Sequence, residues 1–163
     1  MRLPPGRHRL RAAATSRRLG TSGSVFVDVD VPDFQNAPLA LSGLVVHADP
    51  AWTAVGSRRA VLSILPLVPT TRRDFTATDR VTALLRVYRS GRDLSVLVTL
   101  TTTVLDGKGV QVGEAVQTVG AVQASDISID LGRFPLGPGP HLLTVEARAG
   151  RDTVRRQLTF TRH

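Results

Sequence analysis

Two stretches of this sequence, 133 residues apart, carry closely similar residues: Leu3-Pro4-Pro5-Gly6-Arg7-His8-Arg9-Leu10 and Leu136-Gly137-Pro138-Gly139-Pro140-His141-Leu142-Leu143. In each copy a Pro/Gly turn leads into an alternating apolar strand. A short polar turn and a second alternating strand then complete a β-hairpin. The second copy stands near the end of the chain, where we expect the last hairpin of a β-sandwich. By the same reasoning, the first copy is the last hairpin of another sandwich.

The second strand of the first hairpin is expected over residues 23–31. Its odd positions from 25 to 31 are valines and its even positions are mostly polar, which predicts a half-buried strand. Pro32, Asp33 and Phe34 then break the alternation, and residues 35–38 have the composition of a linker. We therefore predict two units. Residues 1–34 are the terminal hairpin of a preceding β-sandwich module, and residues 35–163 are a complete immunoglobulin-like β-sandwich.

The rest of the chain alternates short apolar stretches with turn residues, and no segment has a helical period. A mobile loop is expected at about residues 48–60, and the prolines make 61–68 an edge strand. Other strands are expected at 39–47, 80–88, 94–105, 110–119, 127–131, 141–149 and 153–161. The expected core residues are Val81, Ala83, Leu85, Val87, Leu94, Val96, Val98, Leu100, Thr102, Val104, Phe134, Val145, Leu158 and Phe160. The pattern predicts an all-β fold, an antiparallel immunoglobulin-like β-sandwich preceded by an extra β-hairpin.

Composition excludes several classes of protein. A chain of 163 residues with 42% hydrophobic residues and no apolar run near 18 residues predicts a globular protein without a membrane span. The absence of cysteine excludes disulfides, thiol catalysis and cysteine-ligated metal sites. No export signal is visible, because acidic residues interrupt the apolar run that follows the first arginines.

The net charge of +8 is concentrated in an N-terminal arm. Six arginines precede the first acidic residue of the chain: Arg2, Arg7, Arg9, Arg11, Arg17 and Arg18. Such an arm could contact a polyanion. It has no aromatic residue for base stacking and no helical amphipathic period, which argues against nucleic acid. A lone Trp52 in the expected loop offers a second contact point, suited to a carbohydrate.

Catalytic and metal-binding patterns are sparse. Asp28, Asp30 and Asp33 resemble part of a calcium site, since hard cations prefer clustered oxygens, but their spacing does not fit an EF-hand loop. The same residues also fit the polar face of a strand followed by a turn. The four histidines show no ligand spacing, and there are only two glutamates and no nucleophile-elbow sequence. We therefore predict a protein that is not an enzyme and holds no cofactor or metal.

Three segments resemble the C-terminal region of bacterial von Willebrand factor A-related proteins, large exported proteins found especially in acidobacteria. They are Ser22 to Phe34 (SGSVFVDVDVPDF), Val68 to Phe75 (VPTTRRDF) and Asp79 to Ala83 (DRVTA). The resemblance implies an A-type domain upstream, followed by immunoglobulin-like modules, and a periplasmic or extracellular location.

The A domain itself is not expected in this chain. Residues 126–130 (DISID) approach the metal-binding motif of A domains, but an aspartate replaces the last serine and no apolar strand precedes it. In an antiparallel strand, these polar residues form a solvent-facing row.

The leading hypothesis is a non-enzymatic structural or protein-interaction module of a larger exported protein. Its partner would be a protein or an adjacent domain of the same polypeptide. The alternative is a polyanion- or carbohydrate-binding module that uses the arginine-rich arm or the loop around Trp52. Because an isolated hairpin is marginally stable in water, we also expect the chain to self-associate through its first hairpin.

Overall fold

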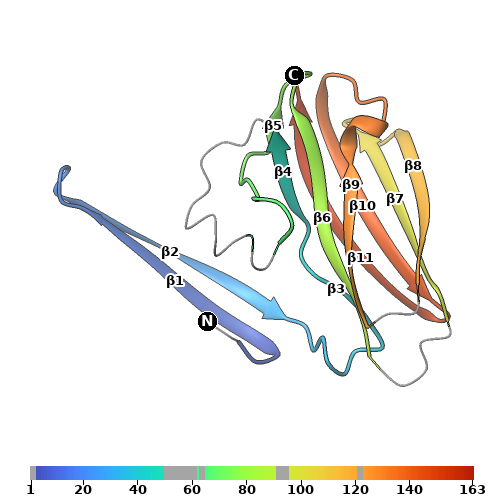
Figure 1. Ribbon diagram of the computed structural model, residues 1–163. Helices are drawn as coiled ribbons and strands as arrows, with labels where there is room; N and C mark the ends of the chain where they lie inside the picture. Colours follow the sequence, from blue (N-terminus) through green and yellow to red (C-terminus); the bar gives the residue numbers. More distant parts are fainter. Residues whose placement is uncertain (1–2, 50–61, 63–64, 91–95, 121–122) are drawn as a thin grey trace.

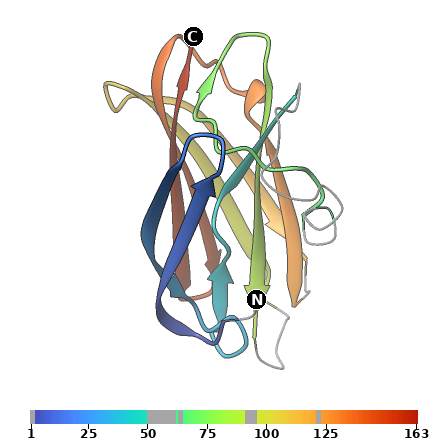
Figure 2. The ribbon, with the colours of Figure 1, turned by 90° about the vertical axis from the view of Figure 1, so that its left-hand side faces the viewer.

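The computed structural model describes residues 3–49, 62, 65–90, 96–120 and 123–163. It shows an all-β protein made of a two-layer sandwich and a long two-stranded arm that projects away from it (Figure 1). The arm consists of β1 (Gly6–Ser16) and β2 (Thr21–Val31), which are antiparallel. In the orthogonal view the arm lies in front of the sandwich (Figure 2).

One layer of the sandwich is a five-stranded sheet in the order β5-β11-β10-β7-β8. Its neighbours are antiparallel except for β5 and β11, which are parallel. The strands are β5 (Asp74–Phe75), β7 (Val98–Asp106), β8 (Gln111–Val119), β10 (Gly139–Ala149) and β11 (Asp152–Arg162).

The second layer is built around β6 (Arg80–Arg89). Two short strands, β3 (Leu39–Leu41) and β4 (Val45–Asp49), pair with successive parts of β6. β9 (Ala124–Asp130) pairs with residues 82–88 of β6, so it occupies the opposite edge. A single 3₁₀ turn, η1 (Leu131–Arg133), follows β9.

The core lies between the two layers and confirms most of the expected positions. Alternate residues of β6 point inward, as do alternate residues of β7, which is the period of a half-buried strand. The buried residues that the sequence identified are Val81, Ala83, Leu85, Val87, Val98, Leu100, Thr102, Val104, Phe134, Val145, Leu158 and Phe160. The acidic row of β9 faces solvent, as predicted.

Several local predictions are wrong. Residues 65–68 form no strand, because Pro66 and the following Pro69 cannot donate to a ladder. Val96 is 44% exposed, since the described strand begins only at Val98. Leu94 and most of the expected loop at 48–60 lie outside the described residues, but Ala48 and the residue after it belong to β4. The expected strand at 39–47 is divided into β3 and β4.

The strand over residues 23–31 exists, but its valines are not packed against a core. Val25 and Val27 are 55% and 49% exposed, and much of β1 is exposed as well. The physical reason is that the arm has two strands and, among the described residues, no second layer over it. It is joined to the sandwich by residues 32–38, where the ring of Phe34 lies 4.5 Å from that of Tyr88.

Candidate interaction surface of the β1–β2 arm

The arm and the last hairpin of the sandwich have the same backbone design. Each has two strands of 11 residues. Each first strand begins at a glycine with positive φ, 125° at Gly6 and 119° at Gly139. The loops also share a left-handed glycine, with φ of 62° at Gly20 and 60° at Gly150. These conformations are accessible to glycine and costly for other residues, so the sequence similarity has a structural basis.

The two hairpins also share a strand register. His8 pairs with Val29, and its counterpart His141 pairs with Phe160. Each histidine uses a ring nitrogen to bond a carbonyl oxygen near the entrance to its strand. His8 Nε2 lies 2.8 Å from the oxygen of Pro4, and His141 Nδ1 lies 3.0 Å from that of Gly139. His141 also stacks on Phe160 in the core. These contacts support a structural role for both histidines.

One face of the arm is apolar, and we call it the valine face. Its residues are His8, Leu10, Ala12, Ala14, Val25, Val27 and Val29. In the last hairpin, the corresponding positions are buried or partly buried against the second layer: His141, Leu143, Val145, Ala147, Arg156, Leu158 and Phe160. The same type of face is therefore covered in one hairpin and open in the other.

Two equivalent cross-strand pairs, one in each hairpin, illustrate this contrast. Leu10 pairs with Val27, and Leu143 pairs with Leu158 in the equivalent register. Leu143 is fully buried, whereas Val27 remains half exposed. Arg156 is the one charged residue among the equivalents of the valine face, and its guanidinium donates to main-chain oxygens of β3 and the residue after it.

The opposite face of the arm is polar and carries its own charge pairing. Arg9 binds Asp28 across the strands through two contacts, 2.7 Å from Nε to Oδ1 and 3.2 Å from Nη2 to Oδ2. This guanidinium lowers the pKa of the Asp28 carboxyl. The guanidinium of Arg11 lies 5.3 Å from the ring centre of Phe26. The ion pair and the contact of Arg11 with the Phe26 ring order side chains of this face, and Phe26 itself stays 60% exposed.

The three acids of the predicted calcium site are not brought together. The carboxylate of Asp28 accepts hydrogen bonds from Arg9, and Asp30 lies further along the polar face of β2. Asp33 accepts hydrogen bonds from the main-chain nitrogens of residues 35 and 36 and from the side chain of Asn36, and these lower its pKa. Among the described residues, no group of three acidic or histidine side chains is arranged to hold a metal ion. Asp33 instead shapes the turn after β2.

The remaining predicted binding residues are divided between the arm and undescribed segments. Arg7 lies on the polar face, and Arg17 and Arg18 lie in the exposed loop between β1 and β2. None of these three forms an ion pair with a described residue. Arg2 and Trp52 lie outside the described residues.

An open apolar groove lies at the base of the arm. Its volume is about 540 Å³, and its apolar lining residues are Leu3, Pro4, Pro5, Val31, Pro32 and Phe34. Val31 continues the alternation of the valine face, so apolar surface extends from the middle of the arm towards the sandwich. The sequence signalled this groove only indirectly, through the two Pro-containing turns.

A smaller apolar cavity of about 250 Å³ lies on the outer side of the β6 layer. Val45, Leu84 and Leu65 line it, and the Arg86–Asp126 ion pair borders it. Asp126 raises the pKa of Arg86 by accepting its hydrogen bonds. Sequence reasoning missed this cavity, because it depends on residues 65–66 lying over the sheet and not within it.

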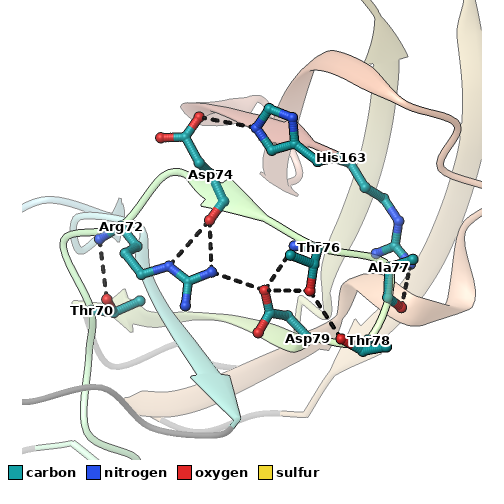
Figure 3. A network of polar contacts seen from close by, with 9 residues as sticks. Thr70, Arg72, Asp74, Thr76, Ala77, Thr78, Asp79 and His163 are labelled. Carbon is teal, nitrogen blue, oxygen red and sulfur yellow. Dashed lines mark hydrogen bonds and ion pairs between the residues drawn. The ribbon is translucent and has the colours of Figure 1, made fainter.

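A polar network beside β5 has a structural role (Figure 3). The carboxylate of Asp79 accepts from the main-chain nitrogen of Thr76 at 2.7 Å and from Arg72 at 2.9 Å. These donors, with the backbone bond of Thr76 the largest contribution, lower the pKa of Asp79. Arg162 of β11 donates to the carbonyl oxygen of Ala77. The network fixes the segment between β5 and β6 against the last strand, and it offers no open site.

Comparison with known proteins provides no assignment. No protein-family model matches the chain, and a search of curated proteins finds no match. In the part of the chain that the structure describes, no helix is long and apolar enough to cross a membrane.

Proposed function

We propose that this chain is a non-enzymatic structural or protein-interaction module, and that the valine face of the arm is its contact surface. The observation that carries the proposal is the exposure of Val25 and Val27 on a hairpin whose counterpart is buried in the sandwich core. A two-stranded ribbon gains little stability by itself, and its apolar side chains favour coverage by other protein.

The proposal includes an immunoglobulin-like arrangement of the sandwich and membership of a larger exported bacterial protein. The resemblance of residues 22–34, 68–75 and 79–83 to von Willebrand factor A-related proteins supports both points. The reading frame upstream of Met1 tests membership of a larger exported protein, because a signal peptide and an A-type domain are expected there. A reading frame with neither would contradict this part of the proposal.

Photochemical cross-linking in the producing cells tests the contact surface. A photoreactive phenylalanine analogue at position 27 is expected to cross-link either to another protein or to an adjacent domain of the same polypeptide, because this position lies on the valine face. Peptide mass spectrometry identifies both kinds of product. The matched control carries the analogue at position 24, since Ser24 lies on the polar face of the same strand. Equal capture at both positions, or none at either, would contradict the proposal.

A polyanion-binding module is a second candidate, favoured by Arg17 and Arg18 in the arm loop, which are exposed and form no ion pair with a described residue. If it is correct, R17Q/R18Q should elute from heparin resin at lower salt, because two exposed cations are lost. R148Q/R151Q is the matched control, because it removes the same charge from two exposed arginines of the equivalent hairpin that form no ion pair with a described residue. Equal elution of the two variants would leave the arm no special role in anion binding.

A further inference from the structure

The last hairpin of the sandwich provides a template for what covers the arm. Its first strand, β10, is paired on both sides, with β11 on one and β7 on the other. Its inward face packs against the layer that contains β3, β6 and β9. The hairpin therefore needs an edge partner and a facing sheet, and the arm has neither among the described residues.

The equivalence of the two hairpins assigns a register to the missing partner. β7 pairs with residues 141–148 of β10 in antiparallel orientation. The corresponding positions of β1 are 8–15, given the shared pairing positions of His8 and His141. An antiparallel strand along residues 8–15 would satisfy the outward-pointing main-chain groups of β1. A second sheet would then cover Leu10, Val25 and Val27.

A second copy of the arm fits this requirement poorly. Two strands of 11 residues present a flat face of roughly 35 by 10 Å, about 350 Å², which is well below the roughly 800 Å² per partner of a standard interface. Face-to-face packing of two arms would also leave the outer edge of each β1 unpaired. A partner that supplies both a facing sheet and an edge strand meets both needs at once.

We infer that the arm completes a β-sandwich that lacks its last hairpin, and that this incomplete sandwich precedes the arm in the same polypeptide. This inference rests on the proposed function of the valine face and names its partner. The partner contributes an antiparallel strand along residues 8–15 and an apolar sheet over the valine face. The polar face, with Arg9 and Asp28, remains in solvent as does the outer face of β10.

Thiol labelling of single-cysteine variants tests the inference, since the chain has no cysteine of its own. Val27→Cys and Ser24→Cys are prepared in the 163-residue chain and in the longer polypeptide encoded by the upstream reading frame. Maleimide labelling of the peptide that contains each position is followed by mass spectrometry, and light scattering gives the mass of each species.

In the longer polypeptide, labelling at position 27 is expected to slow at least about tenfold, because buried groups react only through local opening. Labelling at position 24 should stay fast. Hydrogen exchange over residues 8–15 should also slow, which reports the new edge strand. A sandwich that merely sits nearby would leave both rates unchanged.

Three results would overturn the inference: a stop codon directly upstream, equal labelling of position 27 in both chains, or slow labelling only in a dimer. Its failure can be distinguished from failure of the proposed function. If cross-linking at position 27 captures a different protein while labelling is unchanged, the inference fails and the proposed function stands. If the analogue at position 27 forms neither an adduct with another protein nor an internal cross-link to the preceding segment of the polypeptide, both fail.

Discussion

Leu143→Ala and Leu10→Ala form a matched pair of substitutions at equivalent positions of the two hairpins. Leu143 is fully buried in the core, whereas Leu10 is partly exposed on the arm. Truncating a buried leucine removes its transfer free energy and leaves a cavity, which together cost about 3 kcal/mol. For a sandwich of this size, that corresponds to a fall in Tm of about 10 °C.

In the 163-residue chain, Leu10→Ala should change the free energy of unfolding of the sandwich by less than about 0.5 kcal/mol, as for surface positions generally. Urea denaturation followed by circular dichroism measures both variants. Val145→Ala is a milder substitution of the same core, with an expected cost of about 2 kcal/mol. It keeps the comparison informative if Leu143→Ala does not fold.

Two results would refute this reasoning. An equal loss of stability in both leucine variants would mean that the valine face is packed in the isolated chain. A loss below about 1 kcal/mol for Leu143→Ala, outside the range for buried leucines, would mean that the β10–β11 hairpin contributes little to the core.

Three further predictions concern packing, pH and association. Gly113→Ala should destabilise the sandwich by about 1–3 kcal/mol, because a Cβ there meets the ring of Phe134, whereas Gly120→Ala, with open space around it, should be nearly neutral in the same urea titration. Because Asp79 has a lowered folded-state pKa, its contribution to stability should be complete above the unfolded value of about 3.9 and should disappear as the pH falls through the lower folded value. In thermal melts, Asp79→Asn should weaken this acid dependence, and an unchanged pH profile would contradict it. Because two arms bury too little surface for a stable dimer, the isolated chain should self-associate only weakly and at high concentration, and sedimentation should show less association for Val27→Asp, since a charge disrupts the valine face.

Most of the fold could be predicted from the alternation of apolar and polar residues and from the residues at turns. The inward-facing residues of β6 and β7 follow a strict period of two, so their burial could be predicted before any pairing was known. The two hairpins were also predictable, because Gly6 and Gly139 adopt the positive φ that their turns require. These features are local, and a single sequence contains them.

The errors arose where the outcome depends on tertiary contacts. Residues 65–68 are apolar enough for a strand, yet Pro66 prevents a ladder and the segment lies against the outer cavity. Val96 continues the alternation of β7 but lies before the described start of that strand, where it is largely exposed. Periodicity predicts which side of a strand is apolar, but it does not show whether another layer covers that side.

The residue sizes on the two equivalent faces limit which sandwich the arm can complete. Ala12, Val27 and Val29 occupy the positions of Val145, Leu158 and Phe160, so the arm presents smaller side chains at these three positions. Positions 8, 10 and 14 carry the same residue types as their counterparts. Protein interiors are close-packed, and a smaller face leaves cavities unless the opposing sheet supplies larger residues or lies closer. The arm is therefore a poor substitute for β10–β11 in its own sandwich, which disfavours exchange of hairpins between copies of this chain. Its partner must bring a core shaped for alanine and valine, and that requirement separates the proposed incomplete sandwich from the one in this chain.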